Sequence, residues 1–205
     1  NIAERSGLIR PLTEWVLSSA LEEHRRWRAR GLGLTLSVNL SVITFHNPEL
    51  VSLISSAISA WRMPPEMLQL EITDSDMMSD PTRAAQVLEE LSRMGVRISM
   101  DDFGTGFSSL QHLRNLPIDE LKIDKSYVRA LRDSERERAI VQTILDFAAK
   151  FDIVVVAEGI EDEEDSRILT GMGCDILQGY YFSRPMSPEL VLGWVEGQAR
   201  RPRPT

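Results

Sequence analysis

Residues 101–110 read DDFGTGFSSL and follow the strand-like run RISM at residues 97–100. Neighbouring side chains point to opposite faces of a strand, and burying two adjacent carboxylates inside one would be costly. Where the backbone bends away at a strand end, Asp101 and Asp102 can reach one site, which suits a divalent cation or two cations that share a ligand. The simpler alternative is a solvated Asp-Asp turn with a glycine at positive φ. The rest of the chain favours the site.

Apolar runs alternate with amphipathic stretches on both sides of this segment. The apolar runs predict strands at 35–40, 68–73, 97–101, 120–123, 153–157 and 175–177. The amphipathic stretches predict helices at 7–30, 48–61, 81–94, 108–113, 135–151, 163–170 and 188–194. Such alternation predicts an α/β fold with a mostly parallel sheet covered by helices. The runs LTLSV and VVVA are typical of strands that are buried on both faces.

Local signals add detail to the predicted helices. Asn47 is a plausible N-cap for the second helix, and Asp80 with Pro81 is a typical helix start. The packed face of the first helix is predicted to carry Leu12, Trp15, Val16 and Ala20.

Composition limits the class of protein. The chain has 205 residues and a net charge of −8, which argues against a protein that coats long nucleic acid. The single cysteine, Cys174, excludes an internal disulfide and is compatible with a reducing compartment. The three histidines lack the spacing of a zinc site, and we expect them at the surface or partly buried. No apolar run reaches the length of about 18 residues that a membrane span needs.

Polar groups recur at the carboxyl ends of the predicted strands. In chain order these are Asn39, Glu71 with Asp74, Asp101 with Asp102, Lys122 with Asp124, Glu158 and Gln178. In a β/α barrel this end carries the active site. Each residue also has an ordinary explanation, such as a turn cap for Asn39, a solvated position for Glu71 and a helix cap for Glu158.

Taken together, the strand ends favour metal chemistry. Amide and carboxylate oxygens suit Mg²⁺, Mn²⁺ or Ca²⁺. Lys122 lies between Leu121 and Ile123 in a buried strand, so it needs carboxylate partners, which Asp101, Asp102 or Glu158 would supply. This set suits metal-assisted hydrolysis of a phosphoryl ester, and it suits equally an enolase-like enzyme in which a lysine base works beside a metal.

Six segments in this order resemble a known family. They are SVNLS (37–41), LEITDS (70–75), DDFGTGFSSL (101–110), LKIDKSYV (121–128), VVAEGIE (155–161) and DILQGYYFSRP (175–185). Together they resemble the EAL-domain cyclic-di-GMP phosphodiesterases, from about Ile2 to about Trp194. The resemblance implies a TIM-like (β/α) barrel and hydrolysis of cyclic di-GMP to linear pGpG with Mg²⁺ or Mn²⁺, with Ca²⁺ as an expected inhibitor.

The resemblance also implies residue roles. The implied metal ligands are Asn39, Glu71, Asp101 and Asp102, with the two aspartates at the second metal. The groups implied to position and activate the attacking water are Lys122, Glu158 and Gln178. Asp74 stands where the family usually has Glu, at a position that anchors the glycine-rich loop.

The resemblance also sets expectations for the parent protein. The Glu-Ala-Leu motif is absent and Asn1 is not a natural start, so we expect an N-terminally incomplete barrel with two open sheet edges. The EAL domain is predicted at residues 1–196, followed by a basic, proline-rich tail or linker stub at 197–205. The resemblance implies a cytoplasmic homodimeric domain joined to sensory or GGDEF-type domains, in a parent that could be membrane-anchored. The alternative is a catalytically silent cyclic-di-GMP receptor or a protein-interaction module.

Overall fold

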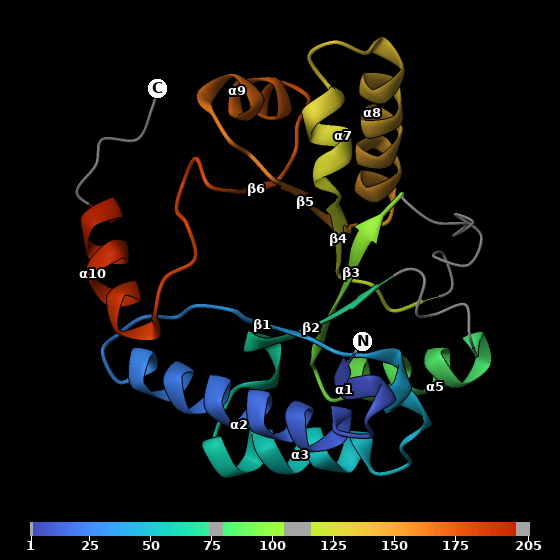
Figure 1. The fold of residues 1–205 in the computed structure, drawn as a ribbon, viewed down its shortest axis with the longest axis vertical. Coiled ribbons are helices and arrows are strands. Elements are labelled where there is room, and N and C mark those ends of the chain that lie inside the picture. Colours follow the sequence, from blue (N-terminus) through green and yellow to red (C-terminus); the bar gives the residue numbers. More distant parts are fainter. Residues whose placement is uncertain (1, 74–79, 105–115, 200–205) are drawn as a thin grey trace.

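A computed structural model describes residues 2–73, 80–104 and 116–199 (Figure 1). Asp74 and the predicted helix at 108–113 lie outside the described residues. The strands are β1 (Leu36–Asn39), β2 (Leu68–Thr73), β3 (Arg97–Phe103), β4 (Glu120–Ile123), β5 (Val154–Glu158) and β6 (Ile176–Gln178). The α-helices are α1 (Ile2–Arg5), α2 (Ile9–Arg28), α3 (Leu50–Trp61), α5 (Pro81–Arg93), α7 (Lys125–Ala130), α8 (Glu135–Lys150), α9 (Glu163–Gly171) and α10 (Pro188–Ala199). Short 3₁₀ helices are η1 (Val42–His46) and η2 (Pro65–Met67).

The strands form one sheet in chain order, β1-β2-β3-β4-β5-β6, and every neighbouring pair is parallel. The sheet curls, and in the described part of the chain β1 and β6 are its edges. Helices surround its outer side, with α2 against β1, α5 against β3, and α7 and α8 against β5 (Figure 1). This incomplete barrel confirms the predicted fold class.

The two faces of the sheet differ in chemistry because side chains alternate along each strand. Leu70, Met100 and Leu121 point outward and are fully buried beneath the helices. Their neighbours on the inner face are polar. The prediction that LTLSV is buried on both faces is wrong, because the inner-face residue Ser37 is exposed.

The buried face of α2 differs from the prediction. Thr13, Leu17, Leu21 and His24 are buried, whereas Trp15 is 67% exposed. Leu12 is also exposed, and Val16 and Ala20 only border the core. Polar residues can occupy the buried stripe because local carbonyls satisfy them: the Thr13 hydroxyl donates to Ile9 O at 2.8 Å, and His24 Nε2 lies 2.8 Å from Leu34 O. The burial of His24 also corrects its predicted placement at or near the surface.

The two predicted helix caps have different outcomes. Asp80 accepts a hydrogen bond from Arg83 N at 3.1 Å, so the predicted start of α5 is confirmed. The predicted cap of α3 is wrong, because Glu49 is the N-cap and Asn47 instead accepts from Glu49 N in the preceding turn. The last helix, α10, continues to Ala199, past the helix end predicted at Trp194.

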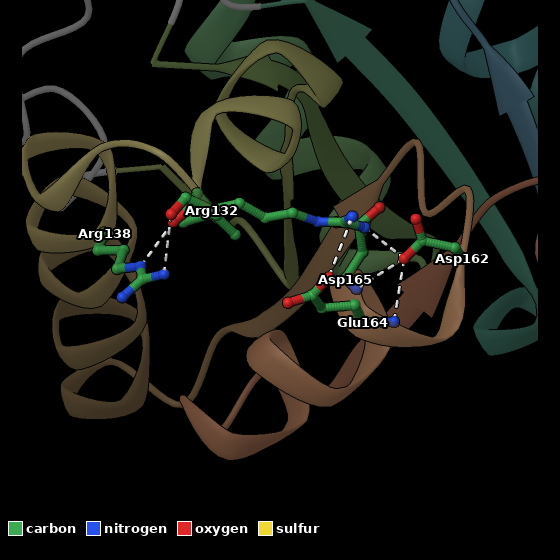
Figure 2. A network of polar contacts seen from close by, with 6 residues as sticks. Arg132, Arg138, Asp162, Glu164 and Asp165 are labelled. Atoms are coloured by element: carbon green, nitrogen blue, oxygen red, sulfur yellow. Dashed lines mark hydrogen bonds and ion pairs between the residues drawn. The ribbon is translucent and has the colours of Figure 1, made fainter.

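A charged network fixes α9 beyond the end of β5. The Arg132 guanidinium lies 2.7 Å from Asp165 Oδ1 and 3.2 Å from Glu164, and it also pairs with Asp162 (Figure 2). Asp165 is buried, and Asp162 caps α9 by accepting from Asp165 N at 3.1 Å. Since α9 follows β5 by only a few residues, this network supports the position of the Glu158 strand end. None of the described helices is long and apolar enough to cross a membrane.

Candidate active site

Lys122 stands among three carboxylates at the carboxyl ends of β2, β3 and β5. Its Nζ lies 2.6 Å from Glu158 Oε1, 3.1 Å from Glu71 Oε2 and 3.3 Å from Asp101 Oδ1. The Lys122 side chain is only 6% exposed. An unpaired ammonium could not be buried to this degree, so the carboxylates are what allow Lys122 to sit in a strand. Of the carboxylate partners that the sequence predicts for Lys122, Asp101 and Glu158 contact it, and Glu71 is an addition.

The parallel register brings these residues together. Lys122 pairs with Val156, two residues before Glu158, so both side chains point to the inner face of the sheet. On the other side of β3, Glu71 is level with Ser99, two residues before Asp101. The four charged side chains, one each from β2, β3, β4 and β5, thus meet on the inner side of the curled sheet. Strand tilt there brings residues at successive positions along neighbouring strands close together.

A second polar layer lies one step deeper and supports Glu71. The Ser37 hydroxyl donates to Glu71 Oε1 at 2.6 Å, which fixes the carboxylate that also faces Lys122. Below it, Glu120 Oε1 accepts from Gln69 Nε2 at 2.6 Å and from the Ser99 hydroxyl at 2.8 Å. Sequence reasoning missed this layer. Its signal was the two-residue spacing from Ser37 to Asn39, Gln69 to Glu71, Ser99 to Asp101 and Glu120 to Lys122.

The charges in the cluster are unequal, and this shifts the pKa of two groups. Burial acts to lower the pKa of Lys122, but the hydrogen bond to Glu158 and the charges of Glu71 and Asp101 outweigh it and raise the pKa. Burial raises the pKa of Glu158, and although Lys122 opposes this, the charges of Asp101 and Glu71 add to the rise. Lys122 therefore stays an ammonium, and Glu158 is a stronger base than an ordinary glutamate.

β3 bends at its aspartate pair, as the sequence predicts. Asp102 has a left-handed φ of +53°, and its N–H donates to Asp101 Oδ1 at 3.0 Å. The register with β4 shifts between Met100 and Phe103. Burial and the negative charges of Asp101 and Asp124 raise the pKa of Asp102. The bend thus allows both carboxylates to leave the regular alternation of the strand, with Asp101 directed to Lys122.

The segment after the bend is held by a residue that sequence reasoning missed. The hydroxyl of Tyr127, on α7, donates to Gly104 O at 2.5 Å. Gly104 has a φ of +95°, and a Cβ there would lie 3.0 Å from the Tyr127 ring. Tyr127 is itself placed by Asp124, which caps α7 by accepting from Ser126 N at 2.9 Å. Asp124 therefore has a structural role at the end of β4.

Two further predicted site residues, Asn39 and Gln178, lie beside this cluster. Asn39 is the last residue of β1, level with Glu71 and exposed. Gln178 is the last residue of β6, level with Glu158 and exposed, and its carbonyl accepts from Ile160 N at 3.1 Å. Asp74 falls outside the described residues.

The donor set fits a hard divalent cation. In the described ranges no three His, Cys, Asp or Glu side chains are gathered as a ready metal site, because the carboxylates turn to Lys122 instead. Three carboxylates face one ammonium, so the cluster keeps a negative surplus that a cation would neutralise. The oxygen atoms of Glu71, Asp101 and Asp102 and the amide of Asn39 are of the type that Mg²⁺ and Mn²⁺ prefer.

Comparisons with known proteins show which family this chain resembles. A family model described as "EAL domain" matches residues 1–185. The bifunctional diguanylate cyclase/cyclic di-GMP phosphodiesterase MucR of Pseudomonas aeruginosa is 40% identical over 195 residues, which cover 95% of this chain and 28% of that protein. The oxygen sensor protein DosP of Escherichia coli is 38% identical over 195 residues, which cover 95% of this chain and 24% of that protein.

A solved structure supports the same relationship. The PaMucR phosphodiesterase in complex with c-di-GMP matches with a TM-score of 0.88 and 40% identity, over 93% of this chain and 77% of that chain. This chain spans less than a third of the length of the two curated relatives.

Proposed function

This chain belongs to the EAL-domain family, and from that premise we propose that it hydrolyses cyclic di-GMP to linear pGpG in a reaction that depends on Mg²⁺ or Mn²⁺. The observation that supports the proposal most strongly is the convergence of Glu71, Asp101 and Glu158 on the Nζ of Lys122. Substrate identity rests on the relatives, since MucR is named a cyclic di-GMP phosphodiesterase.

The raised pKa of Lys122 separates two reactions that suit the same residues. A lysine that removes a proton from carbon, as in an enolase-like enzyme, works best when its pKa is lowered toward neutrality. Lys122 is surrounded by carboxylates that favour its charged form. It is therefore suited to hold an attacking water and to stabilise developing negative charge, which phosphodiester hydrolysis requires.

Glu158 is the group suited to act as general base. Its pKa is raised by burial, which moves it toward the range in which a carboxylate accepts a proton efficiently. In the proposed reaction Glu158 takes a proton from the attacking water, the water oxygen bonds to phosphorus, and the bond from phosphorus to one 3′ oxygen breaks. The 3′ oxygen leaves as a hydroxyl after taking up a proton from solvent water, and Glu158 releases the proton that it accepted back to solvent.

Asn39, Glu71, Asp101 and Asp102 would hold the cation. When bound, Mg²⁺ or Mn²⁺ supplies a Lewis acid that neutralises charge on the phosphoryl oxygens. We assign Gln178 to assist the water, because it lies level with Glu158 on the adjacent strand.

The parent protein is proposed to carry regulatory domains. MucR is named for a diguanylate cyclase activity as well, and DosP is named an oxygen sensor. Since this chain matches only a part of each, sensory or GGDEF-type neighbours and a homodimeric EAL domain are the arrangement we propose.

The test is a product assay on the protein that carries this chain. Cyclic di-GMP is incubated with Mg²⁺ or Mn²⁺, and nucleotides are separated by chromatography. We expect pGpG, with loss of product when EDTA removes the cation. Tight binding of cyclic di-GMP with no pGpG in either metal would contradict the enzyme and support the silent receptor.

A further inference from the structure

A recess lies at the opposite end of the sheet from Lys122. It is about 630 Å³ in volume and lies between the ends of α2 and α3, which run side by side (Figure 1). Its lining is Arg25, Arg28, Ala29, Ala60, Trp61 and Arg62. Each helix leads into the start of a parallel strand, β1 or β2, so this recess, named here the arginine recess, faces away from the strand ends that carry the candidate active site.

Two guanidinium groups in the recess are held in place by neutral partners. The Cζ of Arg25 lies 5.0 Å from the centre of the Trp61 ring, a cation–π contact. Arg28 Nη1 donates to the carbonyl of Arg62 at 3.0 Å. Each contact orients a planar group and leaves most of its N–H donors unused.

The recess also lacks compensating negative charge. No acidic residue lines it. Within the part of the chain that the structure describes, Arg25, Arg28 and Arg62 form no ion pair, whereas Arg26 pairs with Glu22 and Glu23 on the same helix. Three positive charges therefore face a common space in a chain whose net charge is −8.

Arg62 occupies a position that the backbone would assign to glycine. It is the C-cap of α3, with a left-handed φ of 51° and ψ of 42°. Helices commonly end in this conformation with glycine, because a Cβ is strained there. The side chain of Arg62 is thus present against the local backbone preference, which is a pattern found at functional positions.

We propose that the arginine recess binds a phosphate group carried by a small molecule or a lipid. Guanidinium groups match phosphate oxygens in bidentate geometry, and pre-oriented donors reduce the entropy that binding would cost. The volume suits a small phosphorylated ligand, and the open side would also admit a lipid headgroup. Arginines at the C-terminal end of a helix can simply oppose the helix dipole, but that explanation does not account for an arginine in the left-handed backbone conformation that Arg62 adopts.

The test compares Arg62→Gly with Arg93→Ala in the whole protein. Arg93, at the end of α5, is exposed and paired with Glu89, so its loss removes one charge outside the recess. Calorimetry with pyrophosphate measures the free-ligand arm. Flotation with phosphatidylglycerol vesicles, against phosphatidylcholine vesicles, measures the lipid arm.

We expect one arm to show binding that weakens about tenfold or more in Arg62→Gly and is unchanged in Arg93→Ala, because each charge-assisted contact contributes roughly that factor. Thermal stability of Arg62→Gly should be kept, since glycine adopts the left-handed conformation readily. Absence of binding in both arms, or equal binding by Arg62→Gly and the unaltered protein, would overturn the proposal.

Discussion

The Nζ of Lys122 on β4 and the Oε1 of Glu158 on β5 lie 2.6 Å apart, the shortest of the three contacts that Lys122 makes with carboxylates. This pair joins the residue suited to hold positive charge to the residue suited to accept a proton. Because both side chains leave central strands of the sheet, their relative position is set by strand register and not by a loop.

Removal of the ammonium should affect turnover far more than binding. For Lys122→Ala we expect kcat for cyclic di-GMP to fall by about 10²–10⁴-fold, the usual range for a group that acts on a transferred proton or its charge. Lys150→Ala, at the exposed end of α8, is the matched control and should keep its activity. Steady-state kinetics and equilibrium binding give the two quantities, and near-normal kcat in Lys122→Ala would remove Lys122 from the mechanism.

Binding of the cation should depend on Asp101. Asp101→Asn removes a carboxylate that is directed into the cluster, so we expect Mn²⁺ affinity to fall by about tenfold or more, as for a lost charged ligand. Asp146→Asn, on the exposed face of α8, removes the same charge away from the site. Calorimetric titration of Mn²⁺ into each protein is the measurement. Equal affinity in Asp101→Asn and the unaltered protein would refute the assigned ligand.

Gly179, which follows β6, lies so close to Ile160, which follows β5, that it should not tolerate a side chain. A Cβ there would lie 2.1 Å from Ile160 O, whose residue also bonds to Gln178 and Tyr181. We expect Gly179→Ala to lower the free energy of unfolding by about 1–3 kcal/mol, as overpacking does.

Gly193→Ala offers the opposite result. Gly193 lies within α10 with open space around its Cβ position. The change to alanine should therefore raise the free energy of unfolding by up to about 1 kcal/mol. Urea unfolding compares the two variants. If Gly179→Ala were as stable as the unaltered protein, the close approach at Ile160 would be wrong.

The ion pair of Asp162 and Arg132 should make the stability of the fold vary with pH in the acid range. The hydrogen bond from Arg132, and then that from Asp165 N, lower the pKa of Asp162. A carboxylate with a lowered pKa stabilises the fold above its ordinary pKa of about 3.9, and this stabilisation is lost as pH falls through the lower folded value.

The measurement is the difference in melting temperature between the unaltered protein and Asp162→Asn across pH. We expect the difference to be largest near pH 7 and to shrink below about pH 4. Asp133→Asn, an exposed aspartate close by in the chain, is the control. A difference for Asp162→Asn that grew as pH fell would contradict the lowered pKa.

The strands could be predicted because each is a short apolar run bounded by turn residues, and chain-order alternation then indicates a parallel sheet. The site could be predicted in part for the same reason, since a lysine between Leu121 and Ile123 demands carboxylates. Which carboxylates contact it depends on register and strand tilt, and the sequence alone does not contain these. Glu71 therefore enters as a partner of Lys122 only in the structure.

The buried face of α2 and the role of Asp124 could not be predicted, because the local sequence is compatible with more than one interpretation. On α2 an apolar stripe through Leu12 and Trp15 competes with one through Leu17 and Leu21, and only the second is buried. Periodicity cannot choose between them, because Thr13 and His24 become acceptable in the core once carbonyls satisfy them. The six-residue helix α7 is too short for a periodic signal, so Asp124 resembled a site residue when it is a cap.

We assign the hydrolysis of cyclic di-GMP to this site, with Glu158 as the base. The most direct measurement is single-turnover formation of pGpG by the protein that carries this chain and by its Glu158→Gln variant, in Mn²⁺, with cyclic di-GMP affinity measured in parallel. We expect pGpG from the unaltered protein, and a loss of about 10²–10⁴-fold in rate with nearly unchanged affinity in the variant. Equal rates in the two proteins would contradict this assignment.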